Sequence, residues 1–277
     1  MIDGKTRLIA HLGDPIESVK APMIYNPWFE RRGVKAVVVP MGVKAADFPA
    51  AIEALRRMSN FHGALVTMPH KVTALSVVDE LSVTAKVAGA ANAIKRLPDG
   101  TLLGDQFDGA GFVRGIQNKG FVTQGKRAIV SGSGGVGCAI AASLAAAGVA
   151  ELALHDANTA SAEALAGRLR THYPAMKVTV GSNDPEGFDL VVNATPLGMN
   201  EGDPLPFDVS RISPSAFVGE VVMKQAWTPL LQAAKAKGCA VQLGTDMLFE
   251  MIPAYLEFFG FGTATPEELR AVSKVDA

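Results

Sequence analysis

Three glycines with the spacing of a nucleotide-binding turn are the clearest chemical signal in the chain. Gly132, Gly134 and Gly137 fit the pattern Gly-x-Gly-x-x-Gly, between an expected strand at 127–130 and a long alanine-rich segment. The first glycine permits a tight turn, the second lets the backbone approach a pyrophosphate, and the third lets helix and strand pack closely. Backbone N–H groups and the positive end of the following helix would hold the phosphates. The pattern predicts a dinucleotide site, and a plain strand–helix turn is the alternative.

An acidic residue ends the next expected strand. Asp156 follows the run 151–155 and lies 19 residues beyond Gly137. A carboxylate at this position can accept hydrogen bonds from both ribose hydroxyls and would repel a 2′-phosphate. The next residues, 157–159, include no arginine or lysine. We therefore expect NAD as the preferred cofactor, with NADP also possible; a helix N-cap is the other interpretation of the aspartate.

Polar residues that could act on a substrate follow the apolar segment 63–66. Thr67 and Lys71 come directly after it, where open α/β sheets bind ligands. Asn92 and Asp108 lie further along, each in a short segment that contains glycine. A lone lysine or aspartate is most often a solvated surface residue. Spacing alone therefore leaves both a functional and a surface role open.

Composition limits the classes of protein that the chain can be. It has 277 residues, of which 48% are hydrophobic and 19% charged, so it can bury a sizeable core in one large domain or two smaller ones. The 26 basic and 27 acidic residues give a net charge of −1, which argues against a nucleic-acid partner. Cys138 and Cys239 match no zinc or disulfide spacing, and no metal site is expected. The chain shows no targeting segment and no apolar run of ~18 residues, so we expect a cytoplasmic protein without a membrane partner.

Short apolar runs alternate with helical segments in two series, which indicates parallel sheets with crossover connections. The predicted fold class is α/β with two domains and a cleft between them. Residues 1–114 with 247–277 form the substrate domain, and residues 115–246 form a Rossmann-type dinucleotide domain. The expected strands are 7–12, 36–41, 63–66, a hairpin over 93–103, then 127–130, 151–154, 177–180, 190–192, 216–221 and 239–243. The expected helices are 22–32, 46–57, 137–147, 161–171, 228–237 and 246–259.

Over nearly its whole length the chain resembles the shikimate dehydrogenases, including the quinate/shikimate dehydrogenases. The resemblance rests on several motifs that occur in the family's order and at similar spacing. These motifs are Gly13–Ile16, Val66–Lys71, Gly89–Asn92, Asp108–Phe112, Gly132–Gly137, Asn193–Met199, Thr228–Leu231 and Gly244–Leu248.

The resemblance implies the reversible oxidation of a ring hydroxyl to a ketone, with hydride transfer to a nicotinamide. It implies that Lys71 and Asp108 are the catalytic pair, which would bind the hydroxyl and shuttle its proton. Asn92 would hold a substrate hydroxyl, and Thr67 would contribute another hydrogen bond. The residues that would bind the cofactor are Gly132, Ser133, Gly134, Gly135, Val136, Asp156, Asn193, Thr195, Val221, Gly244 and Met247.

The sequence departs from the family at substrate positions. Val19 and Ala21 stand where the family has two hydroxyl residues that bind the substrate carboxylate. Each lost hydrogen bond to a charge is worth roughly 1.5–3 kcal/mol, so shikimate itself should bind weakly unless a neighbouring residue compensates. Apolar side chains also stand where the family has Thr, Tyr and Gln. We therefore expect a substrate that is larger or less polar at one end than shikimate. The expected substrate-binding residues are Ser18, Lys20, Thr67, Asn92, Phe107, Met223 and Met251.

Two other classes of function remain open. A non-catalytic NAD-binding regulator would keep the cofactor loop without the chemistry, although the presence of Lys71 and Asp108 argues against it. A dehydrogenase that acts on a folate-like ligand would suit Phe107, Met223 and Met251, which favour a flatter ligand. For an enzyme of the shikimate dehydrogenase kind or of the folate kind, we expect a small-molecule substrate and a monomer or homodimer.

Overall fold

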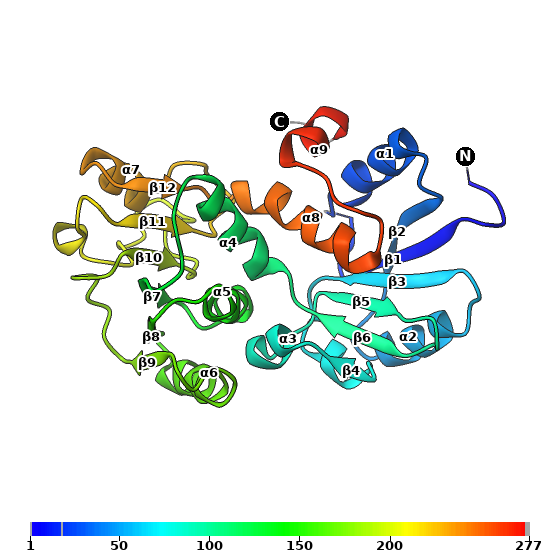
Figure 1. Ribbon diagram of the computed structural model, residues 1–277, viewed down its shortest axis with the longest axis horizontal. Helices are drawn as coiled ribbons and strands as arrows, with labels where there is room; N and C mark the ends of the chain where they lie inside the picture. The colour runs from blue at the N-terminus through cyan, green and yellow to red at the C-terminus, as the bar shows by residue number, and fades with distance from the viewer. Residues whose placement is uncertain (1, 18, 275–277) are drawn as a thin grey trace. The chain divides into compact units, whose positions relative to one another are not determined.

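The computed structural model describes residues 2–17 and 19–274. Its contacts divide the chain into two units, one of Met1–Phe107 with Ile252–Ala277 and the other of Asp108–Met251. Within the described residues, each unit is built on one six-stranded sheet with helices packed against it (Figure 1). The expected two-domain α/β fold is confirmed.

The first unit has a mixed sheet in the order β2-β1-β3-β5-β6-β4. The strands β2, β1 and β3 run parallel, while β5 runs antiparallel to both β3 and β6 as the expected hairpin. The strands are β1 (Arg7–Gly13), β2 (Ala36–Gly42), β3 (Phe61–Val66), β4 (Glu80–Leu81), β5 (Ala93–Arg96) and β6 (Leu102–Asp105). The helices are α1 (Pro22–Arg32), α2 (Phe48–Arg56), η1 (Thr73–Ser76), α3 (Val83–Ala88) and α9 (Pro266–Val272), and α8 (Asp246–Phe259) ends in this unit.

The core of the first unit follows from the spacing of apolar residues in α2. Phe48, Ile52 and Leu55 recur at helical intervals, so they share one face of the helix. They are buried together with Ala10 and Leu12 of β1. On another part of this unit, α9 packs against α1 (Figure 1). The result is a covered sheet whose strand ends are held in fixed positions.

The second unit has an entirely parallel sheet in the order β12-β11-β10-β7-β8-β9. The chain leaves β7 toward β8 and β9, then returns to β10 on the other side. The strand order therefore reverses between β7 and β10, where open α/β sheets bind ligands at the carboxyl ends. The strands are β7 (Arg127–Ser131), β8 (Glu151–His155), β9 (Lys177–Val180), β10 (Leu190–Asn193), β11 (Phe217–Glu220) and β12 (Ala240–Gln242). The helices are α4 (Asp108–Asn118), α5 (Gly135–Ala146), α6 (Thr159–His172), η2 (Val209–Arg211) and α7 (Pro229–Ala236).

The glycine-rich helix α4 was not expected from the sequence. Its glycines are poor helix formers, but they allow close packing. A Cβ atom at Gly109 would overlap the carbonyl oxygen of Ala139 in α5, and one at Gly115 would overlap the side chain of Gln242, the last residue of β12. The short elements β4, α3 and α9 were also not expected. The boundaries predicted at residues 114 and 247 fall inside α4 and α8, whereas the contacts divide the chain at the start of α4 and after residue 251.

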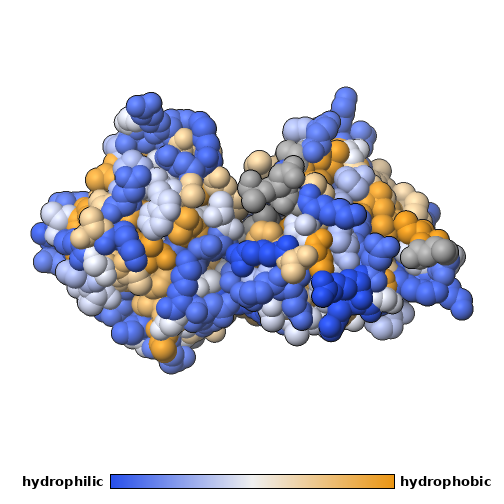
Figure 2. Space-filling model, turned by 90° about the horizontal axis from the view of Figure 1, so that it is seen from above, coloured by the Kyte–Doolittle hydropathy of each residue, from blue (hydrophilic) through white to orange (hydrophobic). Residues whose placement is uncertain are grey.

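The surface is largely polar. Figure 2 shows one face, on which hydrophilic residues surround smaller apolar areas. Two of the large apolar side chains that are exposed, Met199 and Met223, belong to loops of the second unit that line the groove described below.

Candidate active site

The glycine turn after β7 leaves a helix end open to a ligand. Gly132 has φ +104°, and a Cβ atom there would lie 2.6 Å from the carbonyl carbon of Ala194. A Cβ atom at Gly137 would overlap the carbonyl oxygen of Gly132, so only glycine fits at that position. The 12-residue helix α5 then begins after Gly134, which has no side chain that could cap it. Its first N–H groups and its positive dipole end can therefore hold an anion.

A groove of about 330 Å³ lies beside this turn, and we call it the dinucleotide groove. It is formed by the loops that follow β7, β10 and β11, which are neighbouring strands of the sheet. A Cβ atom at Gly134 or Gly135 would meet nothing within 4 Å, so the backbone there can approach a ligand closely. The lining residues are Gly134, Gly135, Val136, Ala194, Thr195, Pro196, Met199, Val221, Val222, Met223 and Lys224. A glycine turn, an open helix end and an adjoining groove together fit a dinucleotide.

Several lining residues were missed by the sequence analysis, namely Ala194, Pro196, Met199, Val222 and Lys224. They belong to the same two loops as the predicted Thr195 and Val221. The sequence did hold a signal for them, because they follow the carboxyl ends of the expected strands, where open α/β sheets bind ligands.

Asp156 ties the end of β8 to the glycine turn. Its Oδ2 accepts a hydrogen bond from the backbone N–H of Ser133 at 2.6 Å, and its Oδ1 accepts one from the N–H of Asn158 at 2.7 Å. A carboxylate oxygen can accept more than one hydrogen bond, so both oxygens keep the capacity to accept from a ribose hydroxyl. Asp156 thus holds the glycine turn, and its role in binding the ribose stays a prediction.

Asn193 shapes the loop after β10 from inside the protein. Its side chain is fully buried, and its Oδ1 accepts hydrogen bonds from the Thr195 backbone N–H at 3.0 Å and from the Thr195 hydroxyl at 2.6 Å. Its Nδ2 donates to the carbonyl oxygen of Leu197 at 3.0 Å. Thr195 lines the groove, so Asn193 positions a lining residue rather than forming the surface itself. Gly244 packs closely against the other groove loop, since a Cβ atom there would overlap the carbonyl oxygen of Val222. Met247, also predicted to bind the cofactor, is buried.

In the first unit, three segments meet at the carboxyl end of β3. The Thr67 N–H donates to the carbonyl oxygen of Leu12 at 2.9 Å, and the carbonyl oxygen of Lys71 accepts from the Ala91 N–H at 2.8 Å. Asn92 follows directly and is 1% exposed. Its Oδ1 accepts a hydrogen bond from the backbone N–H of Phe107 at 2.9 Å. These contacts bring Thr67, Lys71 and Asn92 to one end of the sheet.

A buried histidine lies close enough to Lys71 to feel its charge. His11 of β1 is 8% exposed, and within the described part of the chain its Nδ1 has no hydrogen-bond partner. Burial, assisted by the positive charge of Lys71, lowers the pKa of His11 to about 4. The imidazole is therefore neutral at neutral pH. His70, in contrast, is a core residue that stacks on Phe48 with ring centroids 4.3 Å apart.

The predicted substrate positions are distributed over both units. Phe107 packs its ring against Tyr255 and Phe258, with centroid distances of 4.9 and 5.2 Å. Lys20 is exposed just before α1, and Ser18 lies outside the described residues. In the second unit, Met223 is exposed in the dinucleotide groove, and Met251 is half-buried against Gly111 of α4.

The predicted catalytic residues also come from different units. Lys71 is half-buried in the first unit, and Asp108 is the first residue of α4 in the second unit. A carboxylate in the first turn of a helix is stabilised by the helix dipole. Asp108 is 6% exposed. The assignment of both residues to catalysis stays a prediction.

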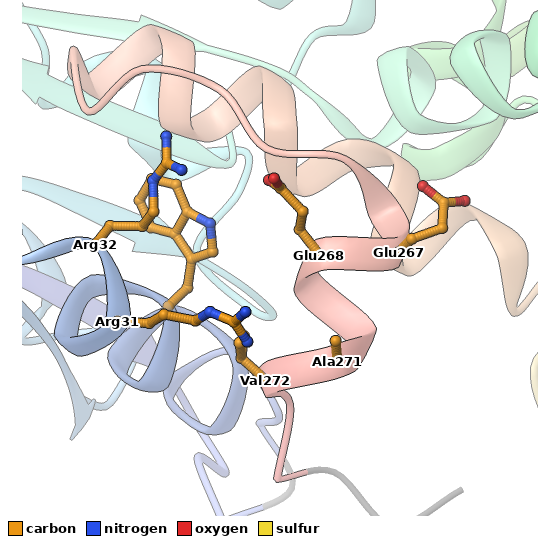
Figure 3. A pocket seen from close by; sticks show the side chains of 7 residues that line it. Arg31, Arg32, Glu267, Glu268, Ala271 and Val272 are labelled. Atoms are coloured by element: carbon orange, nitrogen blue, oxygen red, sulfur yellow. The ribbon is translucent and has the colours of Figure 1, made fainter.

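A second cavity contains none of the predicted site residues. It has a volume of about 350 Å³ and lies between α1 and α9 of the first unit. Figure 3 shows Arg31 and Arg32 on α1 and Glu267 and Glu268 on α9, around this cavity.

Across residues 2–17 and 19–274, no group of three or more His, Cys, Asp or Glu side chains could hold a metal ion. In the same part of the chain, no helix is both long enough and apolar enough to span a bilayer.

Comparisons with known proteins cover both units. A family model described as the shikimate dehydrogenase substrate binding domain matches residues 12–94. A shikimate dehydrogenase (NADP(+)) of Rubrobacter xylanophilus is 36% identical over 251 residues, which are 89% of this chain and 88% of the relative.

Solved structures of a shikimate dehydrogenase and a quinate dehydrogenase are also similar to this chain. Shikimate 5-dehydrogenase from Listeria monocytogenes, in complex with shikimate and NAD, has a TM-score of 0.89 and 26% identity, covering 98% of this chain and 97% of that chain. Quinate dehydrogenase from Corynebacterium glutamicum, in complex with NAD, has a TM-score of 0.83 and 28% identity, covering 96% of this chain and 98% of that chain. The likeness therefore extends over nearly the entire chain.

Proposed function

The chain belongs to the shikimate dehydrogenase family and is an NAD(P)-dependent oxidoreductase acting on CH–OH groups, and we propose that its substrate is a cyclic hydroxy compound less polar at one end than shikimate. The substrate proposal rests on two segments of the first unit, the end of β3 and the segment before α1. The first unit keeps Thr67, Lys71 and Asn92 together at the end of β3, whereas Val19 and Ala21 bring no hydroxyl group to the segment before α1. A carboxylate that gave up its water there would lack those two replacement donors.

Lys71 and Asp108 are proposed as the catalytic pair. A bound nicotinamide dinucleotide would supply the hydride acceptor for oxidation of the alcohol and the hydride donor for reduction of the ketone. The Lys71 amine would donate to the reacting oxygen and exchange its proton, and the Asp108 carboxylate would accept a hydrogen bond from the same hydroxyl or from the Lys71 ammonium. Support for Lys71 comes from its place at the carboxyl end of β3, beside the buried Asn92. Support for Asp108 comes from its burial at the start of α4.

NAD is proposed as the preferred dinucleotide, although the Rubrobacter xylanophilus relative is named for NADP(+). The carboxylate of Asp156 is fixed by the Ser133 and Asn158 backbone N–H groups, so it cannot easily turn away from a 2′-phosphate. We expect kcat/KM to be higher with NAD than with NADP. The Asp156→Ala variant should reduce that ratio at least roughly tenfold, because about 1.4 kcal/mol of discrimination corresponds to a factor of ten. A preference for NADP in the unaltered enzyme would contradict this proposal.

A substrate panel tests the proposed function. Reduction of NAD and NADP is followed at 340 nm with shikimate, quinate and cyclic alcohols that lack the carboxylate or carry an apolar group in its place. We expect turnover of at least one compound, with a lower KM for the less polar ones. If shikimate gives the lowest KM in the panel, the altered-substrate proposal is wrong.

Lys71→Ala tests the catalytic assignment separately. The variant should lose at least roughly 100-fold in kcat, which is the usual contribution of a positioned proton-transfer group. It should still bind NADH, because the dinucleotide groove belongs entirely to the second unit. Lys86→Ala, at an exposed position of α3, is the matched control and should keep full turnover. Retained turnover in Lys71→Ala would remove Lys71 from the mechanism.

A further inference from the structure

Building on this proposed function, we propose that Glu220 is a positioning residue that fixes the two loops of the dinucleotide groove through Thr228 and Asn193. Glu220 is the last residue of β11, and the groove-lining Val221 and Val222 follow it directly. Its side chain is completely buried. A buried carboxyl at the root of a ligand-binding loop is costly, because burial penalises its charged form. Such a residue therefore needs partners, and its partners are the two loops.

The first link runs from Glu220 to the far end of its own loop. Its Oε2 accepts a hydrogen bond from the Thr228 hydroxyl at 2.8 Å, and Thr228 is completely buried as well. The Thr228 Oγ1 in turn accepts from the backbone N–H of Leu231 at 3.3 Å, which caps α7. The segment 221–227 is thus a loop whose two ends are joined by one hydrogen bond between buried side chains.

The second link runs from Glu220 to the loop after β10. Asn193 lies opposite Glu220 in the register of β10 and β11, and its amide faces the Glu220 carboxylate. As described above, the same amide holds Thr195 and Leu197. The loop also approaches Thr228, since a Cβ atom at Gly198 would lie 3.3 Å from the Thr228 Cβ.

Further hydrogen bonds join the two loops above the carboxylate. Lys224 Nζ donates to Asn200 Oδ1 at 2.9 Å, and the Gln225 side chain donates to the Gly198 carbonyl oxygen. Eight of the groove-lining residues belong to these two loops: Ala194, Thr195, Pro196, Met199, Val221, Val222, Met223 and Lys224. A change at the carboxylate therefore reaches the groove without a direct contact with the ligand.

The charge of Glu220 is sensitive to pH in the neutral range. Burial raises the pKa of Glu220 to about 7, and the Thr228 hydroxyl and Asn193 amide offset only part of this effect. Among the described residues of β10, β12 and α7, the groups that shift this pKa are these neutral ones, and no charged side chain contributes. The oxygen Oε1 makes no hydrogen bond to any described residue. The closed loops bury Glu220 and so favour its neutral form, which means that the loops are held most firmly below pH 7 and are loosened as the carboxyl ionises above it.

Dinucleotide affinity as a function of pH tests the inference. The dissociation constant of NADH is measured with the full-length protein from pH 5.5 to pH 8.5; NADH is chosen because it has no 2′-phosphate that titrates in this range. In the unaltered protein the constant should rise at least threefold as the pH rises through about 7. Glu220→Gln, which mimics the neutral acid, should bind at the tighter level at every pH. Glu163→Gln, at an exposed position of α6, is the matched control and should keep the original profile.

Thr228 supplies a second, independent variant. Thr228→Val removes the hydroxyl that lowers the pKa of Glu220, so the midpoint of the profile should move to higher pH. Thr228→Ser keeps the hydroxyl and should restore the original midpoint. A role in stability alone would leave the midpoint unchanged.

Four outcomes would overturn the inference. It fails if Glu220→Gln binds NADH with the original affinity and pH profile, or if Thr228→Val leaves the midpoint in place. If the unaltered protein binds neither NADH nor NADPH, the proposed function fails together with the inference. Tight binding without any pH dependence overturns the inference alone.

Discussion

Replacing the buried histidine beside Lys71 should change how the protein responds to acid. His11 is 8% exposed, and its pKa in the folded protein is lowered to about 4, first by burial and then by the Lys71 charge. In the unfolded chain the same side chain has a pKa of 6.5. The unfolded state therefore binds a proton at pH 5 that the folded state does not. The associated stability is fully present above pH 6.5 and is lost as the pH falls through 4.

The magnitude follows from the difference between the two pKa values. One pKa unit corresponds to about 1.4 kcal/mol, so the difference amounts to about 3 kcal/mol once the pH is below both values. At pH 5 about 2 kcal/mol of this is already lost. For a domain whose total free energy of unfolding is about 5–15 kcal/mol, such a change is easily measured.

The assay is urea unfolding at pH 7.5 and pH 5.0, with the difference between the two free energies as the readout. For His11→Leu this difference should shrink by about 2 kcal/mol, whatever the substitution does to the absolute stability. His172→Leu, at an exposed position of α6, is the control and should change the difference by less than about 1 kcal/mol. Lys71→Met should also shrink the difference, because losing the lysine charge raises the pKa of His11.

One result would refute this reasoning. If the unaltered protein and His11→Leu lose the same free energy between pH 7.5 and pH 5.0, His11 is not a buried neutral imidazole. If only Lys71→Met fails to change the difference, the lysine amine does not lie close to His11, and the arrangement at the end of β3 is wrong.

Two further predictions concern the second unit. Gly137→Ala should weaken NADH binding at least roughly tenfold, because the added methyl group overlaps the Gly132 carbonyl oxygen and overpacking costs about 1–3 kcal/mol; unchanged binding would contradict the closeness of the turn. Because the pKa of Glu220 is raised to about 7 in the folded protein, its carboxyl destabilises the fold progressively as the pH rises above 4.5. Glu220→Gln removes this penalty, so its effect on the free energy of unfolding should be more stabilising at pH 8 than at pH 4, by up to about 3 kcal/mol. Urea unfolding at the two pH values checks this, and an equal effect at both would contradict it.

The sheets and the glycine turn could be predicted from sequence because their signals are local. Short apolar runs form the largely buried parallel strands β1, β3, β7 and β10, and Gly132, Gly134 and Gly137 have the spacing that the turn requires. In a parallel sheet, residues that follow neighbouring strands meet at one edge. Thr195 and Val221, which the family resemblance implies as cofactor-binding residues, lie in the loops after β10 and β11 and line the groove.

Other features depend on packing that a single sequence does not reveal. The glycines of α4 disfavour a helix locally, but Gly109 and Gly115 leave room for α5 and the Gln242 side chain. Asn193 was predicted to line the cofactor, yet its hydrogen bonds turn it inward. Glu220 was not among the predicted site residues, because its role depends on its burial and on its hydrogen bond with the Thr228 hydroxyl; Thr228 begins one of the family motifs, but the motif alone does not reveal that bond.

The most direct test of the central claim is a crystal structure of the ternary complex with NAD⁺ and the panel compound that turns over fastest. We predict that the Lys71 amine and the Asp108 carboxylate both lie within about 2.6–3.2 Å of a partner in one hydrogen-bonded set with the reacting hydroxyl, whose carbon faces C4 of the nicotinamide. A complex in which either side chain points away from that hydroxyl would contradict the assignment.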